Sequence, residues 1–150
     1  MKKTAIVLLT LGLILTSLGA SQAQDQAKQE VELIVIVNAA AKRDSMTEAQ
    51  LGQSLRGGDN HFELVGLQKQ HYDLILKKMV RTNSSDFDRL WIGLIMAGKR
   101  KKKPIISENP IQLVALAGKN RNVIVVIDRR GLSKPASEYG AKEVKILKKK

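Results

Sequence analysis

The chain has 150 residues, and its 26 Lys and Arg residues outnumber its 14 Asp and Glu residues, which gives a formal net charge of +12 at pH 7. It contains no cysteine, which excludes disulfide bonds, thiolate metal sites and lipid attachment through a cysteine. Aromatic residues make up 3% of the chain, so the core must be mostly aliphatic. This length and charge predict one domain with an anionic partner, either a phosphate-like solute, an acidic protein or an anionic membrane surface.

The first residues have the three-part pattern of a secretory signal peptide. Lys2 and Lys3 precede an uncharged run over residues 4–19, and the small residues Ser21 and Ala23 stand where a signal peptidase cuts. A membrane anchor is the alternative, because the run is just long enough to cross a bilayer. Polar residues inside the run favour removal instead. We therefore expect cleavage after residue 23, a periplasmic location and no stable membrane insertion of the mature chain.

After this predicted signal peptide (residues 1–23), a flexible polar lead over residues 24–30 precedes one domain over residues 31–150. The domain opens with residues 31–37, of which six are apolar and five are β-branched. Such a short apolar run predicts a strand covered on both faces, and we expect it at the centre of a sheet. The run over residues 123–127 is apolar at every position and predicts another buried strand. Shorter strands are expected at residues 63–66 and, at a sheet edge, at residues 144–147.

Two helical patterns follow the first strand. Thr47 and Gln50 have the spacing of a capping box, which predicts a helix over residues 48–56. Gly57 and Gly58 then supply the left-handed backbone that a helix end requires. A second helix is expected over residues 69–80. Its apolar residues recur at spacings of three and four, as on one buried stripe: Tyr72, Ile75, Leu76 and Met79.

Two further helices are predicted before the second buried strand. Ser84 or Ser85 caps the first of them, which ends at Gly98. Its apolar residues form one stripe that should face the core: Phe87, Leu90, Trp91, Leu94 and Ile95. An Asn-Pro pair at residues 109–110 starts a short helix over residues 111–117. Helices between buried strands predict an α/β fold, here a single lobe with a mixed, largely parallel sheet flanked by helices.

A run of five basic residues lies between Gly98 and Pro104: Lys99, Arg100, Lys101, Lys102 and Lys103. Two interpretations are open for it. Basic residues are favourable at the negative end of a helix dipole, so the run can be a solvated loop that closes the preceding helix. It can also contact an anionic surface. Export of the chain argues against nucleic acid as the partner.

The order of these segments resembles a known family. The features that carry the resemblance are Val37-Asn38 at a strand end, the Thr-x-x-x-Leu-x-x-x-Leu-x-Gly-Gly helix from Thr47 to Gly58, the aromatic Tyr72 early in a helix, the Trp91 helix running into Gly98-Lys99, and the Asn-x-x-Val-Ile pattern from Asn120 to Ile124. This series is similar to the second lobe of phosphate-type periplasmic solute-binding proteins of the ABC transporter class, and in particular to their short single-lobe members. The similarity runs from Val31 to Leu147.

The resemblance implies an anion site before the second helix, where the family has a Gly-Ser-Gly-type loop. The corresponding stretch here, residues 65–72, has one glycine and no serine. Its polar residues would hold the anion at the helix start: Gln68, Lys69, Gln70 and His71. Asn38 is added because ligands of open α/β sheets bind beyond the carboxyl ends of strands, although it can equally cap a turn.

The sequence does not predict an enzyme, a cofactor or a metal site. It has no nucleophile elbow, no Gly-x-x-x-x-Gly-Lys-Ser phosphate loop and no evident pair of acids. His61 and His71 lie ten residues apart, without the i, i+4 spacing or the cysteines that a zinc site uses.

Two functional hypotheses follow. In the first, the chain is an exported, non-enzymatic binding protein that holds phosphate or another small anion near Asn38 and residues 68–71. A single lobe cannot close over a ligand, so its affinity should be weak unless a transporter component or another partner supplies the second wall. In the second, the chain is an envelope interaction module that binds a protein or an anionic surface through residues 99–103 and has no small ligand.

The signal-peptide hypothesis predicts that the mature chain begins at Gln24. Mass spectrometry of the protein in an envelope fraction measures this start directly. A chain that keeps Met1 and sediments with the membranes would contradict the hypothesis.

Overall fold

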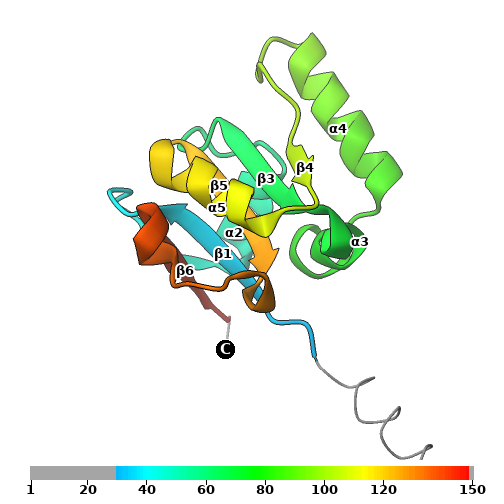
Figure 1. Ribbon diagram of the computed structural model, residues 1–150. Helices are drawn as coiled ribbons and strands as arrows, with labels where there is room; N and C mark the ends of the chain where they lie inside the picture. Colours follow the sequence, from blue (N-terminus) through cyan, green and yellow to red (C-terminus); the bar gives the residue numbers. More distant parts are fainter. Residues whose placement is uncertain (1–29, 149–150) are drawn as a thin grey trace, which may run out of the picture. The chain divides into compact units, whose positions relative to one another are not determined.

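The computed structural model describes residues 30–148 (Figure 1). The chain divides into two units, Met1–Glu30 and Val31–Lys150, and all elements described below belong to the second. The predicted signal peptide over residues 1–23 and most of the predicted lead lie outside the described residues. Within residues 30–148, no helix has both the length and the apolar character that crossing a membrane requires.

Six strands form one mixed sheet in the spatial order β2-β6-β1-β5-β3-β4. β1 runs antiparallel to both of its neighbours, β5 and β6, whereas the other neighbouring pairs are parallel. The strands are β1 (Leu33–Asn38), β2 (Ser45–Thr47), β3 (Leu64–Gln68), β4 (Ile105–Ser107), β5 (Val123–Asp128) and β6 (Ala141–Leu147). The prediction of an α/β fold with a mixed, largely parallel sheet is confirmed, and β1 lies at the centre as expected.

Helices cover both faces of this sheet, with α5 on the near face and α2 on the far face in the view of Figure 1. The α-helices are α2 (Glu48–Leu55), α3 (Tyr72–Ile75), α4 (Ser84–Met96) and α5 (Pro110–Lys119). Short helical turns complete the domain: 3-10 turns at Lys69–His71, Arg129–Gly131 and Ala136–Tyr139, and a π-helical turn at Leu76–Val80.

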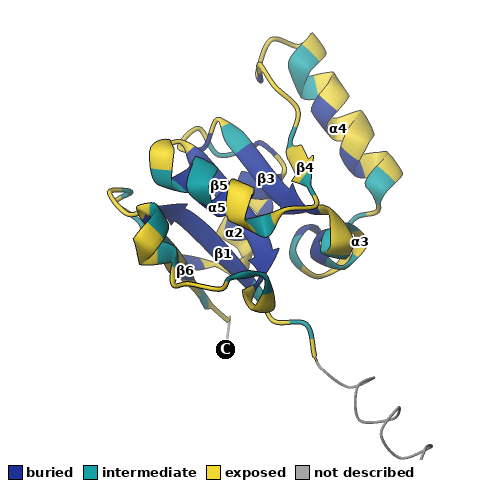
Figure 2. Cartoon of the chain, viewed as in Figure 1, coloured by how far each residue is buried: buried dark blue, intermediate teal, exposed yellow. Residues whose placement is uncertain are grey.

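Alternate residues of the central strands enter two separate cores. Val35 and Val37 of β1 belong to the core beneath α2, α3 and α4, whereas Ile34 and Ile36 belong to the core beneath α5. This division follows from the period of two in a strand, whose side chains alternate between faces. Figure 2 shows β1, β5 and β3 buried along their length. Both faces of these three strands therefore exclude water, as the apolar runs of β1 and β5 predicted.

Two of the three predicted helix starts are confirmed. The N–H of Gln50 donates to Thr47 Oγ1 at 3.2 Å and the N–H of Thr47 donates to Gln50 Oε1 at 2.9 Å, which completes the capping box. Asn109 caps α5 by accepting from the N–H of Ile111 at 3.0 Å. The third start was placed wrongly. Ser84 is already helical and Ser85 follows it, while the cap of α4 is Asn83, which accepts from the N–H of Asp86 at 2.9 Å.

Three other element predictions need correction. β6 is not at the sheet edge, because β2 pairs with its last residues, Lys145 to Leu147. β2 and β4 were not predicted, since strands of three residues are too short to show a period of two. The expected helix over residues 69–80 is a 3-10 turn, a short α-helix and a π-helical turn in series. It ends at Arg81, whose φ of 58° is in the left-handed region.

Gly66 lies inside β3 and lets α5 approach the sheet. A Cβ atom at this position would lie 2.6 Å from Val125 Cγ1 and 3.0 Å from Leu113 Cδ2, which is closer than van der Waals contact permits. The glycine of the stretch that the resemblance aligned with an anion loop is therefore a packing residue within a strand.

Trp91 attaches α4 to the domain. Its side chain is 1% exposed, it packs edge-to-face with Phe87, and its indole N–H donates to the Leu55 carbonyl at 3.3 Å. The predicted stripe is correct for Phe87 and Trp91, and Leu94 and Ile95 are half-buried. Leu90 is 38% exposed, because it lies to the side of the face that Trp91 buries.

Replacing Trp91 by Ala should therefore lower the free energy of unfolding by roughly 3–5 kcal/mol, the range for large aromatic truncations in cores. Denaturant unfolding measures the change. Arg89→Ala is the matched control, because Arg89 is on the same helix with a side chain that is 80% exposed, and it should change the free energy by less than about 0.5 kcal/mol. Equal midpoints for the two variants would contradict the burial of Trp91.

Candidate anion-binding site

The residues predicted to hold an anion lie at opposite ends of the sheet. Leu67 of β3 pairs with Val126, so Gln68, the last residue of β3, lies beside the carboxyl end of β5. Val37 of antiparallel β1 pairs with Ile124, so Asn38 lies at the amino end of β5. The sequence argument placed Asn38 at the carboxyl end of a strand and residues 68–71 at the start of a helix, and the direction of β1 separates the two positions. The structure therefore does not bring Asn38 together with residues 68–71.

Asn38 is buried and its side chain is fully engaged within the protein. Its amide nitrogen donates to the carbonyl oxygens of Ala117 at 3.0 Å and Gly118 at 2.7 Å, near the end of α5. Its side-chain oxygen accepts from the N–H of Ala40 at 2.9 Å. The side chain thus joins the turn after β1 to the end of α5. Of the two roles considered for it, this geometry is that of the turn cap.

At the other end of the sheet, the predicted cations already face carboxylates. His71 Nε2 lies 3.2 Å from Asp128 Oδ2, and Lys69 Nζ lies 2.8 Å from Glu108 Oε1. Gln68 is buried and accepts from the N–H of Asp128 at 2.8 Å. Gln70 is exposed. An added anion would have to displace one of the protein's own carboxylates from this edge.

Asp128 is ionised at neutral pH in this arrangement. Burial raises the pKa of the carboxyl group, but hydrogen bonds from Arg130 and the charge of His71 outweigh that effect and hold the pKa below its usual value. Arg130 binds the same carboxylate at 2.6 Å. The cluster is consequently a set of internally compensated charges.

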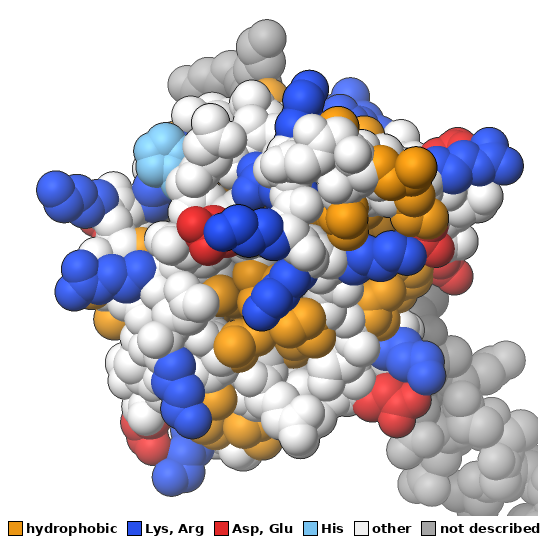
Figure 3. All heavy atoms as spheres, turned by 90° about the horizontal axis from the view of Figure 1, so that it is seen from above, with side chains coloured by type: hydrophobic (Ala, Val, Ile, Leu, Met, Phe, Trp, Pro, Cys, Tyr) orange, Lys and Arg blue, Asp and Glu red, His pale blue; other side chains and the backbone are white. Residues whose placement is uncertain are grey.

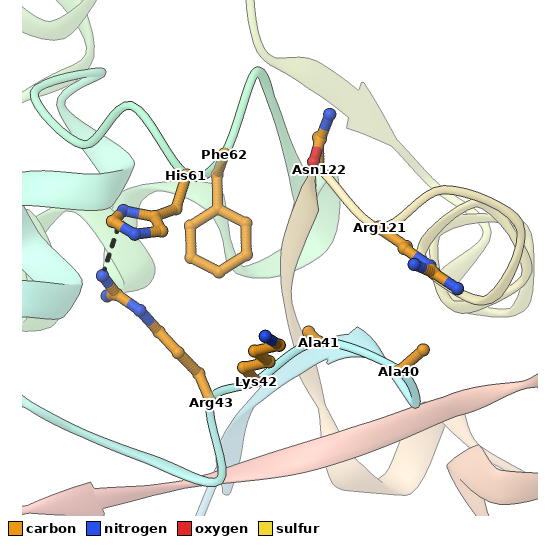
Figure 4. A pocket seen from close by; sticks show the side chains of 8 residues that line it. All are labelled: Ala40, Ala41, Lys42, Arg43, His61, Phe62, Arg121 and Asn122. Carbon is orange, nitrogen blue, oxygen red and sulfur yellow. Dashed lines mark hydrogen bonds between the residues drawn. The ribbon is translucent and has the colours of Figure 1, made fainter.

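A pocket of about 350 Å³ lies at the opposite end, where three loops meet around the carboxyl end of β1 (Figure 4). The loops are those between β1 and β2, between α2 and β3, and between α5 and β5. Apolar side chains and cationic side chains both line the pocket, and in Figure 4 the ring of Phe62 points toward the loop of Ala41 and Lys42. The lining residues are Ala40, Ala41, Lys42, Arg43, His61, Phe62, Arg121 and Asn122.

One half-buried acid, Asp59, holds two of the residues that line this pocket. Its carboxylate lies 3.1 Å from Arg43 Nη1, accepts from Ser54 at 2.9 Å, and contacts the ring nitrogen of His61 at 2.6 Å. Arg43 also lies over the ring of Phe62, with its guanidinium carbon 5.9 Å from the ring centroid. The charge of Asp59 is therefore used to hold Arg43 and His61 in place.

Lys42 and Arg121 have no such partner. Both are exposed, and within residues 30–148 neither makes an ion pair or a side-chain hydrogen bond. They flank the pocket from two different loops, so an anion placed between them would meet positive charge from two directions. The ammonium group of Lys42 and the guanidinium group of Arg121 can donate hydrogen bonds to a carboxylate or a phosphate.

A second hollow of about 410 Å³ shares two loops with the first, those between α2 and β3 and between α5 and β5, and adds the loop between α4 and β4. It is lined by Asn60, Glu63, Leu64, Lys99, Arg100, Lys101, Lys102 and Asn120. The view from above in Figure 3 shows Lys and Arg side chains around exposed apolar ones, with fewer acidic side chains between them. Among residues 30–148, the lysines at positions 99 and 101–103 are exposed and form no ion pair.

Arg100 does not belong to the exposed surface with which it was predicted. Its side chain is buried and donates to the carbonyl oxygens of Gly57 at 2.8 Å, Phe62 at 2.7 Å and Asp59 at 2.6 Å. A guanidinium has enough donors to satisfy several carbonyls at once, which a lysine could not do in this planar arrangement. Arg100 therefore joins the end of α4 to the loop that forms the pocket.

Within residues 30–148, no group of three or more His, Cys, Asp or Glu side chains is placed to hold a metal ion. The pocket residues were not predicted, although one signal pointed toward them. Residues 40–43 directly follow the strand whose carboxyl end was proposed as a ligand position. The contribution of Arg121 had no sequence signal, because it depends on how the loops meet.

No protein-family model matches the sequence, and no curated protein matches it. Among solved structures, the chain is similar to an ABC-type phosphate transport receptor from Vibrio cholerae, with a TM-score of 0.45 and 14% sequence identity. The match covers 77% of this chain and 46% of the receptor, so this chain spans less than half of the receptor's length. At this similarity, the ligand of the receptor gives no information on a ligand of this chain.

The carboxylate of Asp59 predicts a pH dependence. Burial raises its pKa, but hydrogen bonds from His61 and Ser54 and the charge of Arg43 outweigh burial, so the folded-state pKa is lowered. Stabilisation from a lowered carboxyl pKa is complete well above the ordinary Asp value of about 3.9 and is lost as the pH falls through the folded-state value. Asp59→Asn should thus lower the melting temperature at pH 7, and the difference from the parent should shrink on acidification below about pH 4.

Thermal melts of the parent and of Asp59→Asn over a pH series measure this difference in melting temperature. Glu63→Gln in the same loop is the control, because Glu63 is exposed and has no ion pair in residues 30–148. A gap that stays constant down to the acid limit would show that Asp59 does not act through its charge.

Proposed function

We propose that this chain is an exported, non-enzymatic binding protein that holds a small anion in the pocket between Lys42 and Arg121. The observation that carries this proposal is the state of the charges around the pocket. Its acid, Asp59, is bound by Arg43 and His61, whereas Lys42 and Arg121 have no carboxylate partner within residues 30–148. An anion would supply the missing partner.

The lining residues indicate which anion suits this pocket. Phe62 and two alanines supply apolar surface, and Asn122 supplies an amide. A volume of about 350 Å³ falls within the range of about 300–1,000 Å³ for small-molecule sites. An anion with an apolar body, such as a phosphate ester, would use both the cations and the apolar surface. We expect it to bind more tightly than inorganic phosphate.

The edge at residues 68–71 is the less favourable place for an anion. Lys69 and His71 each face a carboxylate of the protein, and that carboxylate is held at high local concentration by the fold. An anion therefore fits better at the other end of the sheet, in the pocket between Lys42 and Arg121, than at residues 68–71.

Isothermal titration with inorganic phosphate and with phenyl phosphate tests the proposal. Lys42→Ala combined with Arg121→Ala should weaken binding at least about tenfold, since hydrogen bonds to charged groups contribute about 1.5–3 kcal/mol each. Lys77→Ala combined with Lys78→Ala is the matched control, because it removes two exposed lysines from the π-helical turn. Added salt should reduce any effect of this control, since distant exposed charges are screened beyond about 8–10 Å.

Lys69→Ala combined with His71→Ala separates the two ends of the sheet. Loss of binding in this variant alone would show that the anion binds at the carboxyl end of β3, near residues 68–71. If neither ligand binds the parent protein at low salt, the proposal of a small-anion site is wrong.

A second candidate function is contact with an anionic surface. It is favoured by the exposed lysines at positions 99 and 101–103, which lie beside the pocket without ion pairs within residues 30–148. Replacing Lys101, Lys102 and Lys103 by Ala should then reduce sedimentation with phosphatidylglycerol vesicles and leave phenyl phosphate titration nearly unchanged. The opposite pattern would reject this candidate and support the small-anion site.

A further inference from the structure

The outer face of α4 carries apolar residues that the domain does not cover. Phe87 and Trp91 bury the inner face of this helix. On the outside, Met96 is 83% exposed and Ile92 is 41% exposed. Ile92 and Met96 lie four residues apart, so their exposed side chains are neighbours on the helix surface, and nothing within residues 30–148 covers them.

The charges along this face have an order that is complementary to itself. Asp88, Ile92 and Met96 follow one another at a spacing of four, which places them on one side of the helix. Lys99 lies three residues beyond the last helical residue, after the left-handed Gly98, and its N–H donates to the Leu94 carbonyl at 2.9 Å. We call Asp88, Ile92, Met96 and Lys99 the α4 outer stripe. It has an acid at one end, two apolar side chains in the middle and a base at the other end.

We infer that the α4 outer stripe binds the same stripe of a second copy of this chain, with the two helices antiparallel. In a two-fold interface, each residue contacts the residue at the mirrored position of the other copy. An axis near residue 94 would set Asp88 of one copy opposite Lys99 of the other, and Ile92 opposite Met96. Both ends and the middle of the stripe would then be matched at once.

Local features of α4 permit such an approach. Gly93 projects into open space, since a Cβ atom at that position would meet nothing within 4 Å. A small residue beside the stripe lets two helix backbones come close. Asp88 and Lys99 make no ion pair or side-chain hydrogen bond within residues 30–148, so their pairing across an interface would break none.

Charge decides between a second copy and other partners. A purely basic stripe would favour an acidic partner or an anionic membrane, but the acid at position 88 would oppose both. An equal number of acids and bases, set at opposite ends, favours a surface with the same pattern reversed. A second copy of the chain carries that surface.

Sedimentation velocity of the purified protein over a wide range of concentration tests this inference. The parent should form a dimer at the higher concentrations. Ile92→Asp combined with Met96→Asp should leave a monomer, because two charges would be buried in the apolar middle. Ile111→Asp is the matched control, since Ile111 is a 37% exposed apolar residue on α5, and it should leave the dimer unchanged. Thermal melts of each variant verify that the fold is intact.

A charge exchange makes the test specific to a second copy. Asp88→Lys alone and Lys99→Asp alone should each weaken the dimer about tenfold, because both end pairs of the interface turn repulsive together. An equimolar mixture of the two variants restores both opposite-charge pairs and should form a dimer with one copy of each. Native mass spectrometry identifies that species by its mass.

Several outcomes would overturn the inference. These are a parent protein that is monomeric throughout, a dimer that survives the Ile92 and Met96 changes, or a mixture of the charge variants that associates no better than either alone. Sedimentation of the parent with phosphatidylglycerol vesicles that is lost in the Ile92 and Met96 variant would assign the stripe to a membrane surface instead.

Discussion

The antiparallel pairing of β1 with β5 organises the rest of the domain. Val35 lies opposite Val126 in this pairing, and both strands are buried on both faces. Side chains alternate along each strand, so the register assigns Val35 to one core and Ile36 to the other. A shift by one residue would exchange the two cores, which the packing of α5 on one face and α2 on the other would not accommodate. The two helical layers therefore depend on this single pairing.

The direction of β1 also determines where loops meet. Because β1 runs antiparallel to β5, its carboxyl end lies beside the amino end of β5 and at the same end of the sheet as the amino end of β3. The loop after β1 thereby meets the loops that precede those two strands. Arg100 then holds the end of α4 against the loop between α2 and β3 through carbonyl oxygens of three residues. The pocket is a product of strand direction and of this one buried guanidinium.

The two ends of the sheet both carry basic side chains, but they differ in how these charges are compensated. At the carboxyl ends of β3 and β5, Asp128 and Glu108 face the nearby cations. At the other end, Asp59 is bound by Arg43 and His61 and Asp44 is bound by Lys142. Lys42, Arg121 and the lysines at positions 99 and 101–103 have no acid of their own within the described residues. The excess of positive charge in the sequence is therefore unevenly distributed over the fold. An external anion at the end where the charge lacks an internal partner would displace only water, which is why we place the proposed anion site there.

Local sequence patterns were enough to predict the features that depend on near neighbours. The capping box of Thr47 and Gln50, the Asn-Pro start of α5 and the doubly buried strands β1 and β5 were all predictable, since a cap or an apolar run involves residues only a few positions apart. Helices between such strands were enough to predict the α/β class and the mixed sheet.

The direction of β1, the burial of Arg100 and the partners of Asn38 depend instead on contacts between distant parts of the chain. Asn38 donates to carbonyl oxygens 79 and 80 residues away, and no local pattern reports a contact at that separation. The same residues could have capped a turn or faced a ligand with equal local preference. The choice was made by which strands pair and in which direction, because that pairing alone determines which loops lie together and which charges find a partner.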